Sequence, residues 1–311
     1  MARKISFVSY KGGVGKTSLT VNLAVCLAQE GYRVLLVDLD TQANASIWLL
    51  RLKRWNRLNA TGEGAIYSIF NPGTATLADC VVRDVIESTD GTTLVPGLDL
   101  VPTTFNLVDL ESDLEHGNPD KAPYTIFQEQ LLEIEKDYDF ILFDCPPDTM
   151  RASQCGIFSS DEVYVPANPD ALSLIGFTLL GEKLQKLRWA ASAYRINGTD
   201  SPAEICGVVF NCVREEGDIE IAEMRMRVRL NQFRSHKLAA ADARIFKARI
   251  RDTDVVRRAF TVGLPVPLLA SRTTETAEIC ADYRNLALEL IHHTPARVCE
   301  YGELEQSVAG F

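Results

Sequence analysis

The sequence lacks the features of a membrane protein, a zinc-binding module and a general nucleic-acid binder. No apolar run in its 311 residues approaches the roughly 18 residues that a membrane-spanning helix needs. Its eight cysteines form no C-x-x-C pair, so it offers neither a zinc ribbon nor a thioredoxin-like motif. The formal net charge of −10 disfavours indiscriminate nucleic-acid binding by the whole surface, but it leaves room for a local basic face.

A secretory signal is also missing, because residues 1–4 lead straight into a predicted strand. The composition, 46% hydrophobic and 24% charged, is that of an ordinary globular protein with ample length for a core. We therefore expect a cytosolic protein.

A glycine-rich loop follows the first apolar run, and leucines at helical spacing come after it. Strand, loop and helix are the context in which a phosphate-binding loop is credible. Glycines let backbone N–H groups approach an anion, and the helix N-terminus adds unpaired donors. Lys16 can then reach the β- and γ-phosphates, and the Thr17 hydroxyl can bind Mg²⁺. The predicted nucleotide-binding residues of this loop are Lys11, Gly12, Gly13, Val14, Gly15, Lys16, Thr17 and Ser18.

The loop departs from the usual G-x-x-x-x-G-K-[ST] pattern, because Tyr10 stands at the first glycine and a second lysine, Lys11, follows it. The run Lys-Gly-Gly-Val-Gly-Lys-Thr resembles the deviant Walker A loop of the ParA/MinD group of P-loop ATPases. In that family the early lysine crosses to the nucleotide of a partner subunit. The resemblance therefore implies an ATP-dependent homodimer in which Lys11 serves the second copy.

Two carboxylates lie at the end of the predicted strand 33–38 and directly after it. The segment 38–45, D-L-D-T-Q-A-N-A, resembles the second signature of the family, D-x-D-P-Q-x-N-A, with Thr41 in place of proline. The family assigns Asp40 to orienting the attacking water and Asp38 to support near Mg²⁺. Two solvated loop acids are the alternative interpretation.

A further apolar strand over 138–144 ends in Asp144, which is a Walker B pattern. Asp144 can hold Mg²⁺ through water beside Thr17, although a helix N-cap aspartate is an alternative. With the resemblance, we expect Thr17, Asp40 and Asp144 at the metal, and Lys11, Lys16 and Asp40 as catalytic residues.

The predicted strand 205–211 ends in Asn211, which resembles the adenine-reading asparagine of the family. An amide can pair with both a donor and an acceptor on the base edge. The family often continues with Asp and Arg, whereas Cys212 follows here. A turn asparagine is the alternative.

Residues 214–258 invert the charge of the chain. They hold ten arginines and two lysines against eight acids, so 12 − 8 gives +4. In the family, basic residues of the C-terminal part hold DNA phosphates without reading sequence. The candidates are Arg225, Arg227, Arg229, Arg234, Arg257 and Arg258. The alternative is a solvated helix laced by its own acids. We also expect a strand over 243–250 and a closing helix over 274–292.

These patterns predict an α/β fold, a doubly wound, mostly parallel sheet with helices on both faces. We expect one P-loop ATPase domain over 1–293 and a short acidic tail over 294–311, which Pro295 and Gly302 break and which is therefore no membrane anchor.

The resemblance implies a ParA-type partition or positioning ATPase that uses ATP and Mg²⁺ and is associated with the nucleoid. Its partners would be a second copy, non-specific double-stranded DNA and an activating ParB-like or adaptor protein. Three alternatives stay open: a MinD-like spatial regulator, a scaffold that holds nucleotide without regulated turnover, and an iron–sulfur reductase using Cys145 and Cys155.

Overall fold

The structure is a computed structural model, and it describes residues 2–71, 73–88, 90–112, 122–191, 203–214, 219–270 and 273–296. The predicted acidic tail lies outside these residues from position 297 onward.

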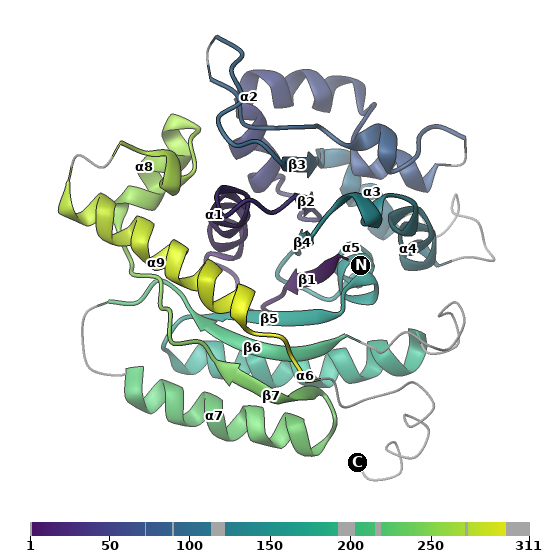
Figure 1. Cartoon of the computed structure of the whole chain (residues 1–311). Helices are drawn as coiled ribbons and strands as arrows, with labels where there is room; N and C mark the ends of the chain where they lie inside the picture. The colour runs from purple at the N-terminus through teal and green to yellow at the C-terminus, as the bar shows by residue number, and fades with distance from the viewer. Residues whose placement is uncertain are drawn as a thin grey trace.

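Among the described residues, seven strands form one sheet in the order β3-β2-β4-β1-β5-β6-β7, and every neighbouring pair is parallel (Figure 1). The strands are β1 Arg3–Phe7, β2 Val34–Asp38, β3 Leu98–Val101, β4 Phe140–Asp144, β5 Glu162–Ala167, β6 Glu204–Phe210 and β7 Ala239–Ile245. All five residues of β2 and of β4 are buried, as expected for parallel strands with helices on both faces.

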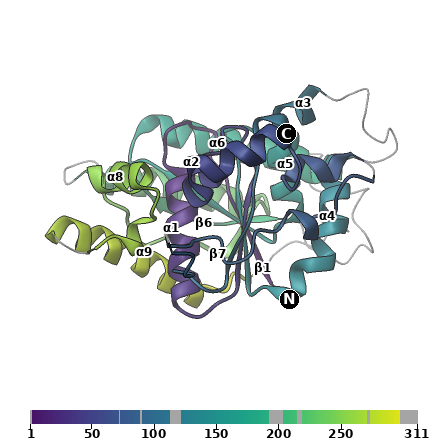
Figure 2. The same ribbon diagram turned by 90° about the horizontal axis from the view of Figure 1, so that it is seen from above.

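Helices cover both faces of this sheet (Figures 1 and 2). The α-helices are α1 Lys16–Gln29, α2 Asn44–Thr61, α3 Asp109–Ser112, α4 Pro123–Ile134, α5 Arg151–Ser159, α6 Ala171–Ala191, α7 Ile219–Ser235, α8 Asp254–Val262 and α9 Thr274–His292. Short 3-10 helices are η1 Ile66–Phe70, η2 Ala78–Cys80, η3 Phe105–Val108, η4 Glu135–Asp137 and η7 Val266–Leu268. Helix α1 packs against α9, whereas α4, α5, α6 and α7 pack successively against one another. The predicted α/β fold with a parallel sheet is confirmed.

The order of the strands reverses at β1. The chain leaves β1 for β2 on one side, and after β4 it crosses to β5 on the other side of β1. In sheets of this kind, ligands bind at the carboxyl ends of the strands, where the order reverses. The glycine-rich loop begins at this point.

One boundary predicted from the sequence needs correction. The strand predicted over 243–250 is wrong in position, because β7 runs from Ala239 to Ile245. Its alanine-rich start has a weak intrinsic strand preference, and its position is set by pairing with β6, where Ala239 lies opposite Ile205. Helix α2, which follows the segment 38–45, is kinked at Arg51.

Short segments cover both edge strands. At β3, Val82 and Leu100 exchange backbone hydrogen bonds of 2.8 and 2.9 Å. At β7, Ala241 donates its N–H to the carbonyl of Ala296 at 3.2 Å, and the Ala296 N–H donates to the Asp242 carboxylate at 2.8 Å. The chain after α9 therefore runs beside the outer strand.

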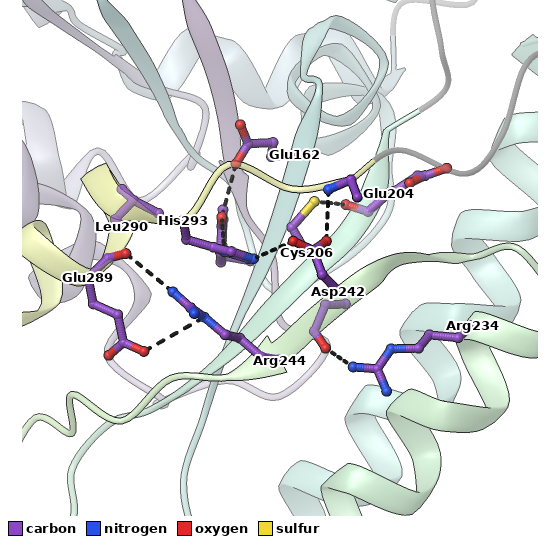
Figure 3. Close-up of polar contacts among 12 residues, drawn as sticks. Glu162, Glu204, Cys206, Arg234, Asp242, Arg244, Glu289, Leu290 and His293 are labelled. Carbon is purple, nitrogen blue, oxygen red and sulfur yellow. Dashed lines mark hydrogen bonds and ion pairs between the residues drawn. The ribbon is translucent and has the colours of Figure 1, made fainter.

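A buried polar cluster ties the end of α9 to the sheet (Figure 3). His293 is 4% exposed, its Nδ1 lies 3.1 Å from the Tyr164 hydroxyl, and its Nε2 lies 3.6 Å from the Asp242 carboxylate. Arg3 donates to the His293 carbonyl at 2.9 Å and forms an ion pair of 2.8 Å with Glu162. Strands β1, β5 and β7 thus meet at one histidine.

This cluster predicts that the contribution of His293 to stability depends on pH. Burial, followed by the positive charge of Arg244, holds the pKa of His293 below its ordinary value, against the opposing pull of Asp242 and Glu162. Because the unfolded chain then binds the proton more tightly, the stability that neutral His293 provides is present above about pH 6.5 and is lost as the pH falls. The contribution of His293 to the free energy of unfolding should therefore be smaller at about pH 5.5 than at about pH 7.5, whereas the raised pKa values of Asp38 and Asp144 act in the opposite direction.

Urea unfolding at both pH values checks this expectation. Acidification should lower the stability of the wild type relative to that of His293→Gln, whereas the exposed control His236→Gln should respond to acidification as the wild type does. Equal changes in the wild type and His293→Gln would show that another group titrates.

Candidate functional site

The glycine-rich loop connects β1 to α1. Gly13 and Gly15 have φ angles of 77° and 73°, the left-handed region that glycine enters at little cost. Gly15 is the N-cap residue of α1, and no side chain caps the helix there. The N–H groups of the first turn therefore remain available to an anion, and the helix dipole favours negative charge at this place.

Asn211 follows β6 and forms hydrogen bonds to the backbone of the glycine-rich loop. It is 2% exposed, and its Nδ2 donates to the carbonyls of Val14 at 2.7 Å and Gly15 at 3.1 Å. A Cβ atom on Gly15 would lie 2.5 Å from this nitrogen, so the contact itself requires glycine. Asn211 also lines a hollow of about 260 Å³ beside Tyr283. Its role as an adenine reader stays a prediction.

Asp38 uses both carboxylate oxygens within the protein. One oxygen accepts from the backbone N–H and hydroxyl of Ser46 at 2.8 and 2.6 Å, and the other accepts from the Asp40 N–H at 3.1 Å. Burial and then repulsion from Asp144 raise its pKa well above the ordinary value, against the Ser46 hydrogen bonds. Asp38 therefore fixes the turn that carries Asp40 into the cleft.

Asp144 lies at the carboxyl ends of three adjacent strands, because it pairs in register with Phe7 on one side and Asp38 on the other. Its side chain is buried, and its Oδ2 has no hydrogen-bond partner among the described residues. Burial raises the pKa of Asp144 to about 7, although the Thr17 hydroxyl acts in the opposite direction. A buried carboxylate oxygen without a partner is costly unless a cation or donor reaches it.

The residues at this point fit Mg²⁺. Within the described ranges, no three His, Cys, Asp or Glu side chains gather as a metal site. Magnesium in nucleotide sites commonly uses one or two carboxylates, with phosphate and water as its other ligands. The free Oδ2 of Asp144 and the nearby Thr17 hydroxyl are such ligands.

Lys16 is the buried cation of the site. It is 7% exposed, and burial lowers its pKa while the charges of Asp144 and Asp40 act to raise it. Asp40 is also 7% exposed, and its carboxylate accepts from the Gln42 N–H at 2.9 Å. A lysine and two carboxylates therefore meet under the loop.

The loop opens into a cleft of about 590 Å³, which is lined by residues of α1, α2 and α8 and of neighbouring loops. Its lining comprises Gly12, Gly13, Gly15, Lys16, Thr17, Ser18, Asp40, Asn44, Trp48, Pro147, Val256, Arg257, Phe260 and Thr261. The rings of Trp48 on α2 and Phe260 on α8 meet edge to face, with centroids 5.4 Å apart. Helix α8 thus forms a wall of the cleft, which the sequence did not indicate.

Lys11, the second lysine of the loop, forms an ion pair with Asp170, just before α6. Burial acts to raise the pKa of Asp170, but the hydrogen bonds from Lys11 and Ser173 prevail and lower it. The side chain of Lys11 is 20% exposed. In this conformation the ammonium group is held within its own chain.

The six arginines predicted to contact DNA do not form one surface. Arg225, Arg227, Arg229 and Arg234 lie on α7, whereas Arg257 and Arg258 lie on α8, far from α7 (Figure 1). Arg227 and Arg249 share Glu223 at 2.7 and 2.8 Å, and Arg258 lies 3.7 Å from Glu275. Several of these charges are therefore already balanced by acids.

Comparison with known proteins places this site in a family. A family model described as an AAA domain matches residues 2–194, more than half of the chain. Over 180 residues the chain is 34% identical to the sporulation initiation inhibitor protein Soj of Bacillus subtilis, a match that covers 58% of this chain and 64% of Soj. The chain belongs to the ParA/MinD-type P-loop ATPases.

Two further proteins of the ParA/MinD group are similar to this chain, one in sequence and one in fold. The chromosome partitioning protein ParA of Caulobacter vibrioides is 30% identical over 187 residues, which cover 60% of this chain and 63% of ParA. The matches thus span just under two thirds of these relatives. The septum site-determining protein MinD of Pyrococcus horikoshii, solved with Mg-ADP, shares the fold with a TM-score of 0.63 and 24% identity, covering 94% of this chain and 97% of MinD. In the described part of the chain, no helix is long and apolar enough to cross a membrane.

Besides the α8 wall, sequence reasoning missed several residues of the site, among them the following three. Ser46 binds Asp38, Asp170 binds Lys11, and Trp48 lines the cleft. Only Ser46 had a signal, because it directly follows the segment 38–45.

Proposed function

We propose that residues 1–293 act as one ATPase domain of the partition or positioning type. ATP would close two copies into a dimer that binds non-specific double-stranded DNA, and a ParB-like or adaptor protein would stimulate hydrolysis and release the DNA. The protein would then work in the cytoplasm, on the nucleoid. The observation that carries this proposal is the uncapped start of α1, with Lys16 and the unpartnered Asp144 oxygen beside it.

The chemistry would be positioning plus charge neutralisation. The N–H groups of the loop and Lys16 would hold the β- and γ-phosphates. Mg²⁺, held by Thr17, Asp144 and Asp40, would supply further positive charge at the phosphates. Asp40 would orient the attacking water, and its place in the cleft lining supports this role.

Dimer formation would require Lys11 to exchange partners. Its ammonium group now pairs with Asp170, and it would leave that carboxylate for the nucleotide of the second copy. A triphosphate carries more negative charge than one carboxylate, so the exchange favours the ATP state over the empty state.

Co-sedimentation with double-stranded DNA in ATP, in ADP and without nucleotide tests the proposal. We expect binding with ATP only, and a steep loss of binding as salt rises. Equal binding in all three nucleotide states would remove the switch from the proposed function.

Arg257 would contact the nucleotide in this proposal, and its position in the cleft lining supports this role. Arg257→Ala should weaken ATP binding about tenfold, at the low end for a charge-assisted hydrogen bond because the side chain is 80% exposed. The matched control is Arg258→Ala, whose side chain is outside the cleft lining and should bind ATP like the wild type. Titration with a fluorescent ATP analogue measures the affinity of both variants. If Arg257→Ala and Arg258→Ala bound ATP equally well, Arg257 would not contact the nucleotide and would again be a candidate for DNA contact.

A further inference from the structure

The second half of α2 carries positive charge that no acid among the described residues pairs with. Between Asn44 and Thr61 the helix has three arginines, one lysine and no acid, in a chain of net charge −10. Lys53, Arg54 and Arg57 are exposed, and no described residue forms a hydrogen bond or an ion pair with their side chains. We name these three residues the α2 cation face.

The opposite side of this half-helix is fixed in the core. Trp55 is 3% exposed, and its indole N–H donates to the carbonyl of Thr103 at 2.9 Å. Its ring also meets Phe105 edge to face, with centroids 4.9 Å apart. The α2 cation face is therefore displayed on a rigid support, which lowers the entropy cost of binding.

Arg54 and Arg57 also border a hollow of about 400 Å³. Asp79 is the acid in its lining, and one of its oxygens accepts from the N–H and hydroxyl of Thr76 at 2.9 and 2.7 Å. These hydrogen bonds lower the pKa of Asp79. The carboxylate is thus engaged by Thr76, and the two guanidinium groups remain available.

The same helix reaches the cleft of about 590 Å³ beside the glycine-rich loop, which we name the phosphate cleft. In its first half, Asn44 and Trp48 line the cleft. The kink follows at Arg51, whose φ of 59° and ψ of 149° are unusual for a residue with a side chain. One element therefore connects the nucleotide site to the exposed cations, with a strained residue between its two halves.

We propose that the α2 cation face binds the phosphate backbone of double-stranded DNA. This inference rests on the proposed function, and it assigns the DNA contact to α2 rather than to α7. Unpaired cations without an acid on the same helix are complementary to a phosphate polymer and read no sequence.

A membrane surface fits the same helix less well. An interfacial helix inserts a broad apolar face into the bilayer. The large apolar side chains Trp48, Leu49, Leu50 and Trp55 are already buried in the core, and Leu52 is the exposed exception at 58%. No apolar face is left on α2 to insert.

The test compares two triple variants of the full chain. One is Lys53→Ala/Arg54→Ala/Arg57→Ala, and the other is the matched α7 variant Arg225→Ala/Arg227→Ala/Arg229→Ala. Fluorescence anisotropy with duplex DNA of arbitrary sequence and ATP gives the dependence of log K on log salt between about 50 and 200 mM. Loss of three phosphate contacts should reduce this slope by about 2.7 per subunit in the α2 variant. The α7 variant should keep the wild-type slope.

A conservative variant and two controls sharpen the test. Arg54→Lys/Arg57→Lys keeps the charge and should keep the slope. Binding of a fluorescent ATP analogue should match the wild type in all variants, because none of these residues lines the phosphate cleft. Thermal unfolding should stay close to that of the wild type, because surface charges and the exposed Arg227–Glu223 pair contribute little to stability.

Three results would overturn the inference. A reduced slope in the α7 variant alone would move the contact to α7 and leave the proposed function standing. Absence of DNA binding by the wild type in every nucleotide state would contradict both this inference and the proposed function. Altered binding to polyglutamate, with unchanged binding to DNA, would show that the α2 cation face takes an acidic protein.

Discussion

Replacing Lys16 with alanine should abolish ATP binding, with a loss in affinity of at least about 100-fold. The ammonium group is buried beside Asp144 and Asp40, and it is the cation that would offset a triphosphate there. Without it, two carboxylates would face the phosphates, and a charge-assisted hydrogen bond of about 1.5–3 kcal/mol would be lost together with the neutralisation. Titration with a fluorescent ATP analogue and an assay of phosphate release measure the effect.

Lys11→Ala is the informative comparison for that variant. Lys11 lies in the same loop but pairs with Asp170, so its loss should leave ATP binding by the monomer within several-fold of the wild type and remove the ATP-dependent dimer. If Lys16→Ala bound ATP like the wild type, the loop would not hold the phosphates.

Replacing Asp40 with alanine should slow hydrolysis by at least about 100-fold and trap the ATP dimer. A positioned proton acceptor commonly contributes about 10²–10⁴ in rate. Thr17 and Asp144 would remain as ligands of Mg²⁺, and removing this carboxylate also relieves its repulsion with the bound triphosphate, so ATP should be held as well as in the wild type or better. Phosphate release and light scattering after size-exclusion chromatography in ATP measure the two effects.

The variant Asp40→Asn removes the negative charge of this side chain but keeps its shape. The amide oxygen can still accept from the Gln42 N–H, as the carboxylate does at 2.9 Å, but it cannot act as a base. We expect slow hydrolysis in both variants. A variant that stayed monomeric in ATP while the wild type dimerised would show that Asp40 has another role.

The contiguous part of the site could be predicted from the sequence. A phosphate loop needs glycines, a lysine and a hydroxyl residue within a few positions, and the physical demands on each are local. The Walker B acid could be predicted for a similar reason, because Asp144 ends a run of apolar residues that becomes a buried strand. The fold class followed from these strands and the helices between them.

The remaining contacts depend on tertiary structure, which local patterns do not encode. Lys11 and Asp170 are 159 positions apart, and Asn211 is 197 positions from Val14. Arg257 belongs to a basic stretch in the sequence, but the packing of α8 turns it toward the phosphate cleft. The predicted position of the strand that became β7 was wrong for the same reason, because pairing with β6 outweighs the local strand preference of the residues.

The covered edges of the sheet limit how copies of this protein can assemble. An open edge strand is a template for another strand, which is a common start of aggregation and of continuous intermolecular sheets. Here the N–H groups of Leu100 and Ala241 already have partners in Val82 and Ala296. Self-association that used side chains instead of these edges would let a subunit leave its neighbour without breaking a ladder of backbone hydrogen bonds.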